Sequence, residues 1–286
     1  MAERCGVIAV CGHEAAYGSA LDGLVDAGVT VVPSGRELFR SVSARLRGDE
    51  ETVVVPMTLG RDPELVADTA RTLRAVPGGD RGATLLAAPF GTAQHLVGWL
   101  RAAAGRAPGT TALLVTAPSG DPFEDAELYR IAALVRRYGH HDLVEVAFTG
   151  GDPDPAAGVR RCRLLGAEQV TLLPAGFASP ELPEVSGGPP LPVDRAGPLV
   201  SASALRRVLA ERVSDARRRW REHGDDGVAA GLTAAENHGH SHTHPPGEGH
   251  GHDHGHGHHH DRGPGHTHTH QHPSADGAGQ VIRSIA

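Results

Sequence analysis

Short apolar runs alternate with amphipathic segments along the first 222 residues of the chain. The apolar runs have the length of buried strands and end at glycine, proline or polar residues, whereas the amphipathic segments repeat with a helical period. Because a strand is followed by a helix again and again, the pattern predicts an α/β fold with parallel sheets. The predicted strands cover residues 6–11, 29–32, 52–56, 83–88, 111–116, 143–148 and 170–174; the predicted helices cover 34–46, 62–74, 92–104, 121–138, 154–165 and 201–222, with a weakly helical connection at 15–26.

The pattern starts again near residue 111. Segments 43–60 and 160–177 share the same outline of helix, small turn, strand, proline and glycine-bearing loop. We interpret this likeness as an internal duplication, although any two strand–helix–strand units share part of such an outline. The segment 180–198 is rich in proline and glycine and is predicted to be a loop.

The composition of the chain limits the kinds of molecule that it is expected to bind. The chain has 286 residues, enough for one large or two small domains, and its formal net charge of -7 gives no indication of nucleic-acid binding. A basic leader followed by an apolar segment is absent, and no apolar run approaches about 18 residues. We therefore expect a cytoplasmic protein with neither a nucleic-acid nor a membrane partner.

The three cysteines do not indicate a disulfide framework or a zinc ribbon. Cys5, Cys11 and Cys162 show no C-x-x-C spacing. Cys11 stands close to His13, so it is either a metal ligand or, as we favour, a small buried apolar residue.

The polar residues that end the predicted strands are the candidates for chemistry. Ligands of parallel sheets bind beyond the carboxyl ends of the strands, and the first strand ends there with His13 and Glu14. The strand at 52–56 leads to a loop and helix start with Glu64 and, one turn later, Asp68. Acids are also favoured at a solvated helix N-terminus, and that alternative stays open for this pair. His95 follows the strand at 83–88, but a surface histidine is the more common role.

Three features together resemble the CbiX-type sirohydrochlorin chelatases, which are class II chelatases of cobalamin and sirohaem synthesis. They are the strand that opens onto G-H, the segment "VVVPMTLG....ELVADT", and the duplicated halves. The resemblance covers residues 5–222 and implies two similar chelatase-like lobes around a cleft, each a parallel β-sheet flanked by helices. We therefore expect an N-terminal lobe at 1–108 with the active site, a C-terminal lobe at 109–223, and a tail at 224–286.

The resemblance is incomplete at both signature motifs. The family usually carries G-H-G-S-R after the first strand, and residues 12–16 read G-H-E-A-A, so only His13 is kept. A second family histidine lies in a pattern like G-x-H-x-x-x-D, and counting back from Asp68 puts Glu64 at its position. In the second half, 118–121 stands where a copy of the first motif would lie, without a histidine.

The resemblance implies a metal chelatase, a lyase that inserts a divalent ion into a sirohydrochlorin-type tetrapyrrole in cobalamin biosynthesis. The ion is the substrate, with cobalt expected and iron or nickel as alternatives, and no organic cofactor is expected. Metal insertion removes two pyrrole protons, and a histidine can both hold the ion and accept a proton, while a neighbouring carboxylate takes the second proton or orients the imidazole. We expect His13 as metal ligand and base, Glu64 as second ligand or base, Glu14 as third, and Arg61 as the arginine that binds substrate carboxylates. The alternative function is a non-catalytic metal carrier or storage protein derived from a chelatase.

The tail is exceptionally rich in histidine. Residues 238–272 hold 15 of the 20 histidines, mostly as H-x-H. Such a composition cannot bury a core and is expected to be disordered without a ligand. Imidazoles bind late first-row divalent ions, so we expect a local metal buffer; a repeat-expanded solubility tail is the alternative. The predicted tail ligands are His238, His240, His242, His244, His250, His252, His254, His256, His258, His259, His260, His266, His268, His270 and His272.

Overall fold

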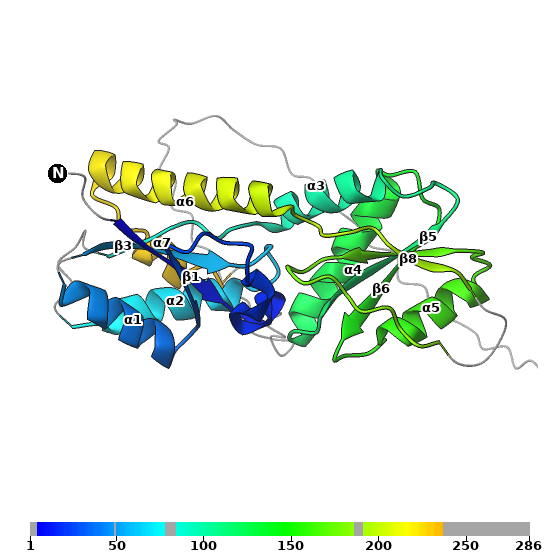
Figure 1. Cartoon of the computed structure of the whole chain (residues 1–286), viewed down its shortest axis with the longest axis horizontal. Helices are drawn as coiled ribbons and strands as arrows, with labels where there is room; N and C mark the ends of the chain where they lie inside the picture. Colours follow the sequence, from blue (N-terminus) through cyan, green and yellow to red (C-terminus); the bar gives the residue numbers. More distant parts are fainter. Residues whose placement is uncertain (1–4, 49, 78–83, 186–190, 237–286) are drawn as a thin grey trace, which may run out of the picture. The chain divides into compact units, whose positions relative to one another are not determined.

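The computed structural model describes residues 5–48, 50–77, 84–185 and 191–236 (Figure 1). They form a mixed α/β fold with two four-stranded parallel sheets flanked by helices. The predicted fold class is confirmed for this part of the chain. The tail histidines lie outside the described residues.

The first sheet brings two of the predicted strand ends side by side. Its strands run parallel in the order β2-β1-β3-β4, and Cys11 at the end of β1 pairs with Met57 at the end of β3. The segments that follow these two strands therefore leave the same edge of the sheet at the same level. The strands are β1 (Cys5–Cys11), β2 (Val29–Pro33), β3 (Glu51–Met57) and β4 (Thr84–Leu86).

The second sheet repeats the strand order of the first, as the predicted duplication requires. Its order is β6-β5-β7-β8, again parallel throughout. Strand β8 lies inside the segment 180–198, so the prediction of a continuous loop was wrong there. A strand of three residues that pairs with only one neighbouring strand is too short to leave an alternating pattern in the sequence. The strands are β5 (Ala112–Pro118), β6 (Val144–Thr149), β7 (Val170–Pro174) and β8 (Val193–Arg195).

Local sequence explains where several helices begin. In each of α2, α4 and α5 an aspartate caps the helix and a proline takes the first helical position, the most favourable order for a helix start. None of the helices in the described ranges has the length and apolar character needed to span a bilayer. The helices are α1 (Arg36–Leu46), α2 (Pro63–Ala75), α3 (Ala93–Ala104), α4 (Pro122–Arg137), α5 (Pro155–Leu164), α6 (Ala202–His223) and α7 (Val228–Leu232), with a 3-10 segment η1 (His13–Leu21).

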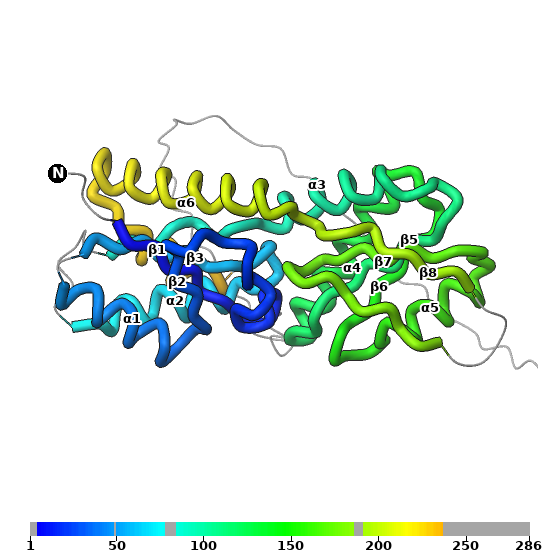
Figure 2. Tube along the Cα trace, in the orientation of Figure 1, coloured from blue at the N-terminus to red at the C-terminus, as the bar shows by residue number. Residues whose placement is uncertain are grey.

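Two helices pack on the sheet of the other half of the chain. Helix α3, from the first half, lies against α4 and β7, and helix α6, from the second half, lies against β3 and β4 (Figure 2). Arg217 of α6 forms an ion pair with Glu51 of β3, with 2.9 Å between Nε and Oε1. The sequence boundary at 108/109 separates the two sheets, but it assigns both helices to the wrong lobe. An amphipathic pattern shows that a helix has a buried face and does not show which sheet buries it.

The ordered core also extends beyond the predicted boundary at residue 224. Helix α7 packs on α2, and the backbone N–H of Leu86 donates a 2.8 Å hydrogen bond to the carbonyl oxygen of Asp226. The side chains of Asp225 and Asp226 accept from the backbone N–H groups of Gly227 and Val228, which fixes the start of α7. The prediction of a tail without structure from 224 was therefore wrong for residues 224–236. A five-residue helix is too short to show a period in the sequence.

A glycine pair tests how firmly α7 is attached. Gly224 and Gly227 both have positive φ, but a Cβ would contact the carbonyl oxygen of Leu86 only at Gly227. Gly224→Ala should lower the free energy of unfolding by about 1–2 kcal/mol, the usual cost of a left-handed alanine, and Gly227→Ala should lower it by more. Urea unfolding of both variants measures the difference, and equal losses would contradict the docking of α7 described above.

Candidate metal centre

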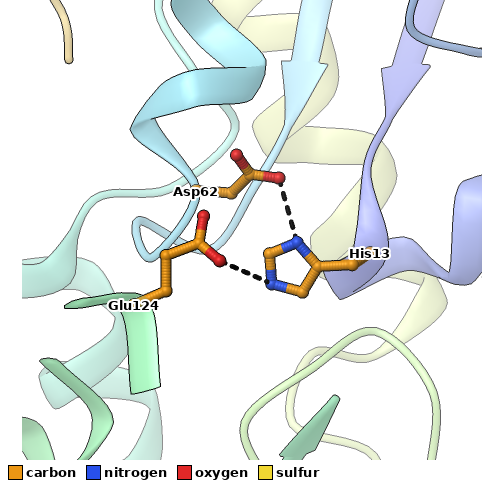
Figure 3. Close-up of side chains that lie close together, drawn as sticks. All are labelled: His13, Asp62 and Glu124. Atoms are coloured by element: carbon orange, nitrogen blue, oxygen red, sulfur yellow. Dashed lines mark ion pairs between the residues drawn. The ribbon is translucent and has the colours of Figure 1, made fainter. Parts of the chain in front are cut away.

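Three side chains from three separate segments meet at one point (Figure 3). His13 follows β1, Asp62 precedes α2, and Glu124 lies in the first turn of α4. One nitrogen or oxygen atom from each of them lies within 4.8 Å of the other two. One imidazole and two carboxylates form a donor set suited to divalent first-row metal ions. The group therefore qualifies as a candidate metal centre, built from both halves of the chain.

The imidazole of His13 lies between the two carboxylates. Its Nδ1 is 3.2 Å from Oδ2 of Asp62, and its Nε2 is 3.5 Å from Oε2 of Glu124. When the ring hydrogen is on Nδ1 and is donated to Asp62, the lone pair of Nε2 faces a carboxylate oxygen. The Nε2 atom is buried and makes no hydrogen bond to any residue in the described part of the chain. Two facing acceptors attract only when a cation, either a proton or a metal ion, lies between them.

Asp62 owes its position to the start of α2. As the N-cap residue it accepts a 2.7 Å hydrogen bond from the backbone N–H of Leu65 through Oδ1, which leaves Oδ2 for His13. A side chain at Gly12 would collide with that same Oδ2 atom, so glycine before His13 allows the close approach of the loop. The glycine of the G-H pair at the end of β1 is thus required by packing against Asp62.

Glu124 belongs to the capping box of α4. Its Oε2 accepts a 2.9 Å hydrogen bond from the backbone N–H of Asp121, whose carboxylate in turn accepts from the N–H of Glu124 at 2.8 Å. The capping box points the carboxylate back past the helix start, toward His13. The segment that lacks a histidine copy in the second half thus contributes an acid. The sequence pattern D-P-x-E after a strand is typical of a capping box, but it does not show what the acid faces.

The surroundings raise the pKa of two of these groups. Burial lowers the pKa of His13, but the hydrogen bond to Asp62 and the charges of Glu124, Asp62 and Glu14 outweigh it, so the pKa is raised above 6.5. Burial is the main cause that raises the pKa of Glu124 from 4.5 to about 7. Both groups therefore bind protons at pH values where an isolated carboxyl is ionised.

Glu14 is not a member of this group. It is 1 % exposed, and its Oε2 accepts hydrogen bonds from the hydroxyl of Thr58 and, at 3.0 Å, from the backbone N–H of Leu59. Burial raises the pKa of this carboxyl. Its neighbour in the sequence, His13, faces Asp62 and Glu124 instead.

Arg61 lies in the interior and not at a rim. Its guanidinium is buried and donates to the carbonyl oxygens of Pro118 at 3.3 Å and Glu124 at 3.4 Å, with an ion pair to Asp125 at 3.3 Å. Because these donors are used within the chain, the structure does not place Arg61 where it meets substrate carboxylates. It joins the loop before α2 to the start of α4.

Glu64 lies on the outer side of α2. Its carboxylate is more than half exposed and pairs with Arg71 at 3.3 Å, as does Asp68 at 2.6 Å. Asp62, from the loop before α2, lies next to His13 instead. Helix α2 begins at Pro63, and Asp62, as its capping residue, turns its side chain across the helix end. Asp62 stands two residues after Gly60, which is the G-x-H spacing of the motif, so the sequence did carry a signal for it.

The two other candidates near the strand ends have structural roles. His95 is exposed at the start of α3, where its ring accepts from the backbone N–H of Thr92. Cys11 is fully buried in the apolar core, and burial raises its thiol pKa to about 12. This is the environment of a small buried apolar residue, the interpretation favoured for Cys11.

Comparison with known proteins gives no assignment: no protein-family model matches the chain, and no curated protein matches it significantly.

The buried role of Arg61 leads to a stability prediction. Arg61→Met removes a buried guanidinium and leaves carbonyl oxygens without donors, so the free energy of unfolding should fall by about 3 kcal/mol or more. Arg71→Met, which breaks only exposed pairs with Glu64 and Asp68, is the matched control and should cost less than about 1 kcal/mol. Unfolding in guanidinium chloride measures the free energy of unfolding of both variants. Similar losses in the two would argue against a role of Arg61 in holding the two halves together.

The raised pKa of Glu124 predicts a pH dependence of stability. A carboxyl whose folded-state pKa is raised stabilises the fold fully below its unfolded pKa, and this contribution is lost as the pH rises from 4.5 to about 7. The raised pKa of His13 acts in the same direction above pH 6.5. Glu124→Gln removes the first contribution, so its stability relative to the parent protein should increase with pH through that window. Metal-free urea unfolding at several pH values measures this, and a difference that is constant with pH would contradict it.

Proposed function

We propose that the chain is a chelatase that inserts a divalent metal ion, with cobalt expected, into a sirohydrochlorin-type tetrapyrrole. The observation that carries the proposal is the facing pair of acceptors, His13 Nε2 and Glu124 Oε2, at 3.5 Å beside Asp62. Such a pair holds a metal ion or protons, and chelation is an exchange between the two.

The exchange balances at this group. A tetrapyrrole gives up two N–H protons when its nitrogens take a divalent ion. The ion leaves His13, Asp62 and Glu124, and the two protons are accepted by His13 at Nε2 and by the Glu124 carboxylate. With the ion bound, its two positive charges neutralise the two carboxylates. With the protons bound, the imidazolium neutralises Asp62 and Glu124 is uncharged. The net charge of the buried group is zero in both states, so the exchange avoids the cost of a buried unpaired charge.

The pKa values suit this exchange. A proton acceptor works best when its pKa is near the working pH, and those of His13 and Glu124 are raised toward or above neutrality. Asp62 keeps the Nδ1 hydrogen and holds the ring in the orientation that directs Nε2 at Glu124.

The ligand set limits the choice of metal without fixing it. An imidazole with two carboxylates suits Fe²⁺, Co²⁺, Ni²⁺ and Zn²⁺ and offers none of the thiolates that softer ions prefer. The expectation of cobalt rests on the resemblance to the cobalt-handling chelatases alone.

A metal carrier is the second candidate, and the burial of the ligands favours it. The side chains of His13, Asp62 and Glu124 are only 16 %, 9 % and 10 % exposed. Such a shielded group retains a bare ion well, whereas a macrocycle must approach it closely. In the carrier the same ion would pass to another protein and not to a tetrapyrrole.

The test uses the full-length chain with the fifteen histidines of 238–272 replaced by glutamine, so that metal bound by the tail does not hide the centre. Sirohydrochlorin and Co²⁺ are mixed with this protein, and the absorbance change of the tetrapyrrole gives the insertion rate. His13→Ala and Glu124→Gln should each lower the rate by about 100-fold or more, because each removes a ligand and a proton acceptor. Asp68→Asn, an exposed acid of α2, should leave the rate unchanged.

The outcomes separate the two candidates. A rate no faster than the spontaneous reaction, together with binding of one Co²⁺ that depends on His13, would leave the carrier and remove the chelatase. A folded protein that binds no Co²⁺ in this background would remove both.

A further inference from the structure

A chain of hydrogen bonds connects the buried Glu14 to the metal-centre residue Asp62. The hydroxyl of Thr58 donates to Oε2 of Glu14. The same hydroxyl oxygen accepts from the backbone N–H of Gly60 at 2.9 Å and from that of Asp62 at 3.2 Å. Glu14 also accepts from the N–H of Leu59 at 3.0 Å. The whole turn from 58 to 62 is thus folded around one hydroxyl and one carboxylate.

The direction of these hydrogen bonds is fixed by Glu14. A threonine hydroxyl has one hydrogen and two lone pairs. Because the Glu14 carboxylate accepts the hydroxyl hydrogen of Thr58, both lone pairs of the hydroxyl oxygen are left for the backbone N–H groups of Gly60 and Asp62. Without an acceptor at position 14, the hydroxyl would turn its hydrogen elsewhere and the turn would lose part of this support.

Glu14 is itself held from the other half of the chain. Its backbone carbonyl oxygen accepts a 3.2 Å hydrogen bond from the N–H of Phe177, in the segment after β7. Its side chain is 1 % exposed, and Oε1 has no hydrogen-bond partner among the described residues. Leaving a buried carboxyl oxygen without a hydrogen bond costs free energy. A residue with only a structural role at this position would not have to bear that cost.

We propose that Glu14 and Thr58 are positioning residues that set the place of Asp62 and thereby the metal affinity of the centre. The inference rests on the metal centre of the proposed function. Glu14, next to His13 in the sequence, acts through Thr58 and not by contact with the ion. Partners that orient the ligands of a metal typically change its affinity by about 10–100-fold when they are removed.

The experiment measures Co²⁺ affinity and the visible absorption spectrum of bound Co²⁺, again in the full-length chain with the fifteen tail histidines replaced by glutamine. Thr58→Val keeps the size of the side chain and removes the hydroxyl, and it should weaken Co²⁺ binding by about 10–100-fold and alter the spectrum. Thr58→Ser keeps the hydroxyl and should restore both. Glu14→Leu should weaken binding in the same way, and Glu14→Gln, which keeps an acceptor oxygen, should weaken it less.

The second half offers a matched control for the loss of a buried threonine hydroxyl. Thr116 lies in β5, is 2 % exposed, and has a hydroxyl with no hydrogen-bond partner within the ranges that the structure describes. Thr116→Val should therefore leave the Co²⁺ affinity and the spectrum unchanged.

Three results would overturn the inference: parent-like Co²⁺ binding by Thr58→Val, failure of Thr58→Ser to restore binding, or equal weakening by Thr116→Val. Circular dichroism checks that each variant is folded; if Thr58→Val is not, the ratio of affinities between Glu14→Gln and Glu14→Leu decides, and equal affinities would overturn the inference. A parent protein that binds no Co²⁺ at all instead refutes the metal centre itself.

Discussion

The buried guanidinium of Arg61 is the interaction on which the rest of the site depends. It comes from the loop that carries Asp62, and it donates to the carbonyl oxygens of Pro118, at the end of β5, and of Glu124, in the first turn of α4. Desolvating a guanidinium is costly, and only several well-placed acceptors offset that cost. Those acceptors all belong to the other half of the chain, so the charge is stable in the interior only when the two halves are together. The same contact brings the two carboxylates of the centre to the two sides of His13.

The exchange of helices strengthens this dependence. Helix α3 packs on the second sheet and α6 on the first, and one buried apolar cluster contains residues of both sheets. One face of each sheet is buried mainly by its own half, and the other face is covered in part by the helix from the other half. The candidate metal centre, whose three side chains come from both halves, is therefore supported by the core as well as by Arg61. This gives a physical reason for side chains that are far apart in the sequence to hold a fixed spacing.

The centre combines groups whose roles differ because their surroundings differ. Asp62 gives one oxygen to a helix N-terminus and the other to His13. Glu124 is buried with its carboxylate toward Nε2 of the imidazole, and Glu14, although adjacent to His13, supports the turn before Asp62. In the proposed function, acids within a small volume thus serve as ligand, proton acceptor and scaffold. Such separation of roles by environment is typical of sites that move protons.

The sequence by itself determined the α/β class and the repeated strand–helix order, and it singled out His13 at the end of β1, which lies in the three-residue group with Asp62 and Glu124. These follow from hydrophobic periodicity and from the geometry of parallel sheets, which are properties of local segments. Only the tertiary structure decided that Asp62 and Glu124, and not Glu64, face His13, that Arg61 is a buried clamp, and that α3 and α6 change lobes. These features depend on which side of a helix start meets which neighbour across the two halves. The pattern of residue types along the chain shows which face of each helix or strand is buried. It does not show which neighbouring element that face packs against.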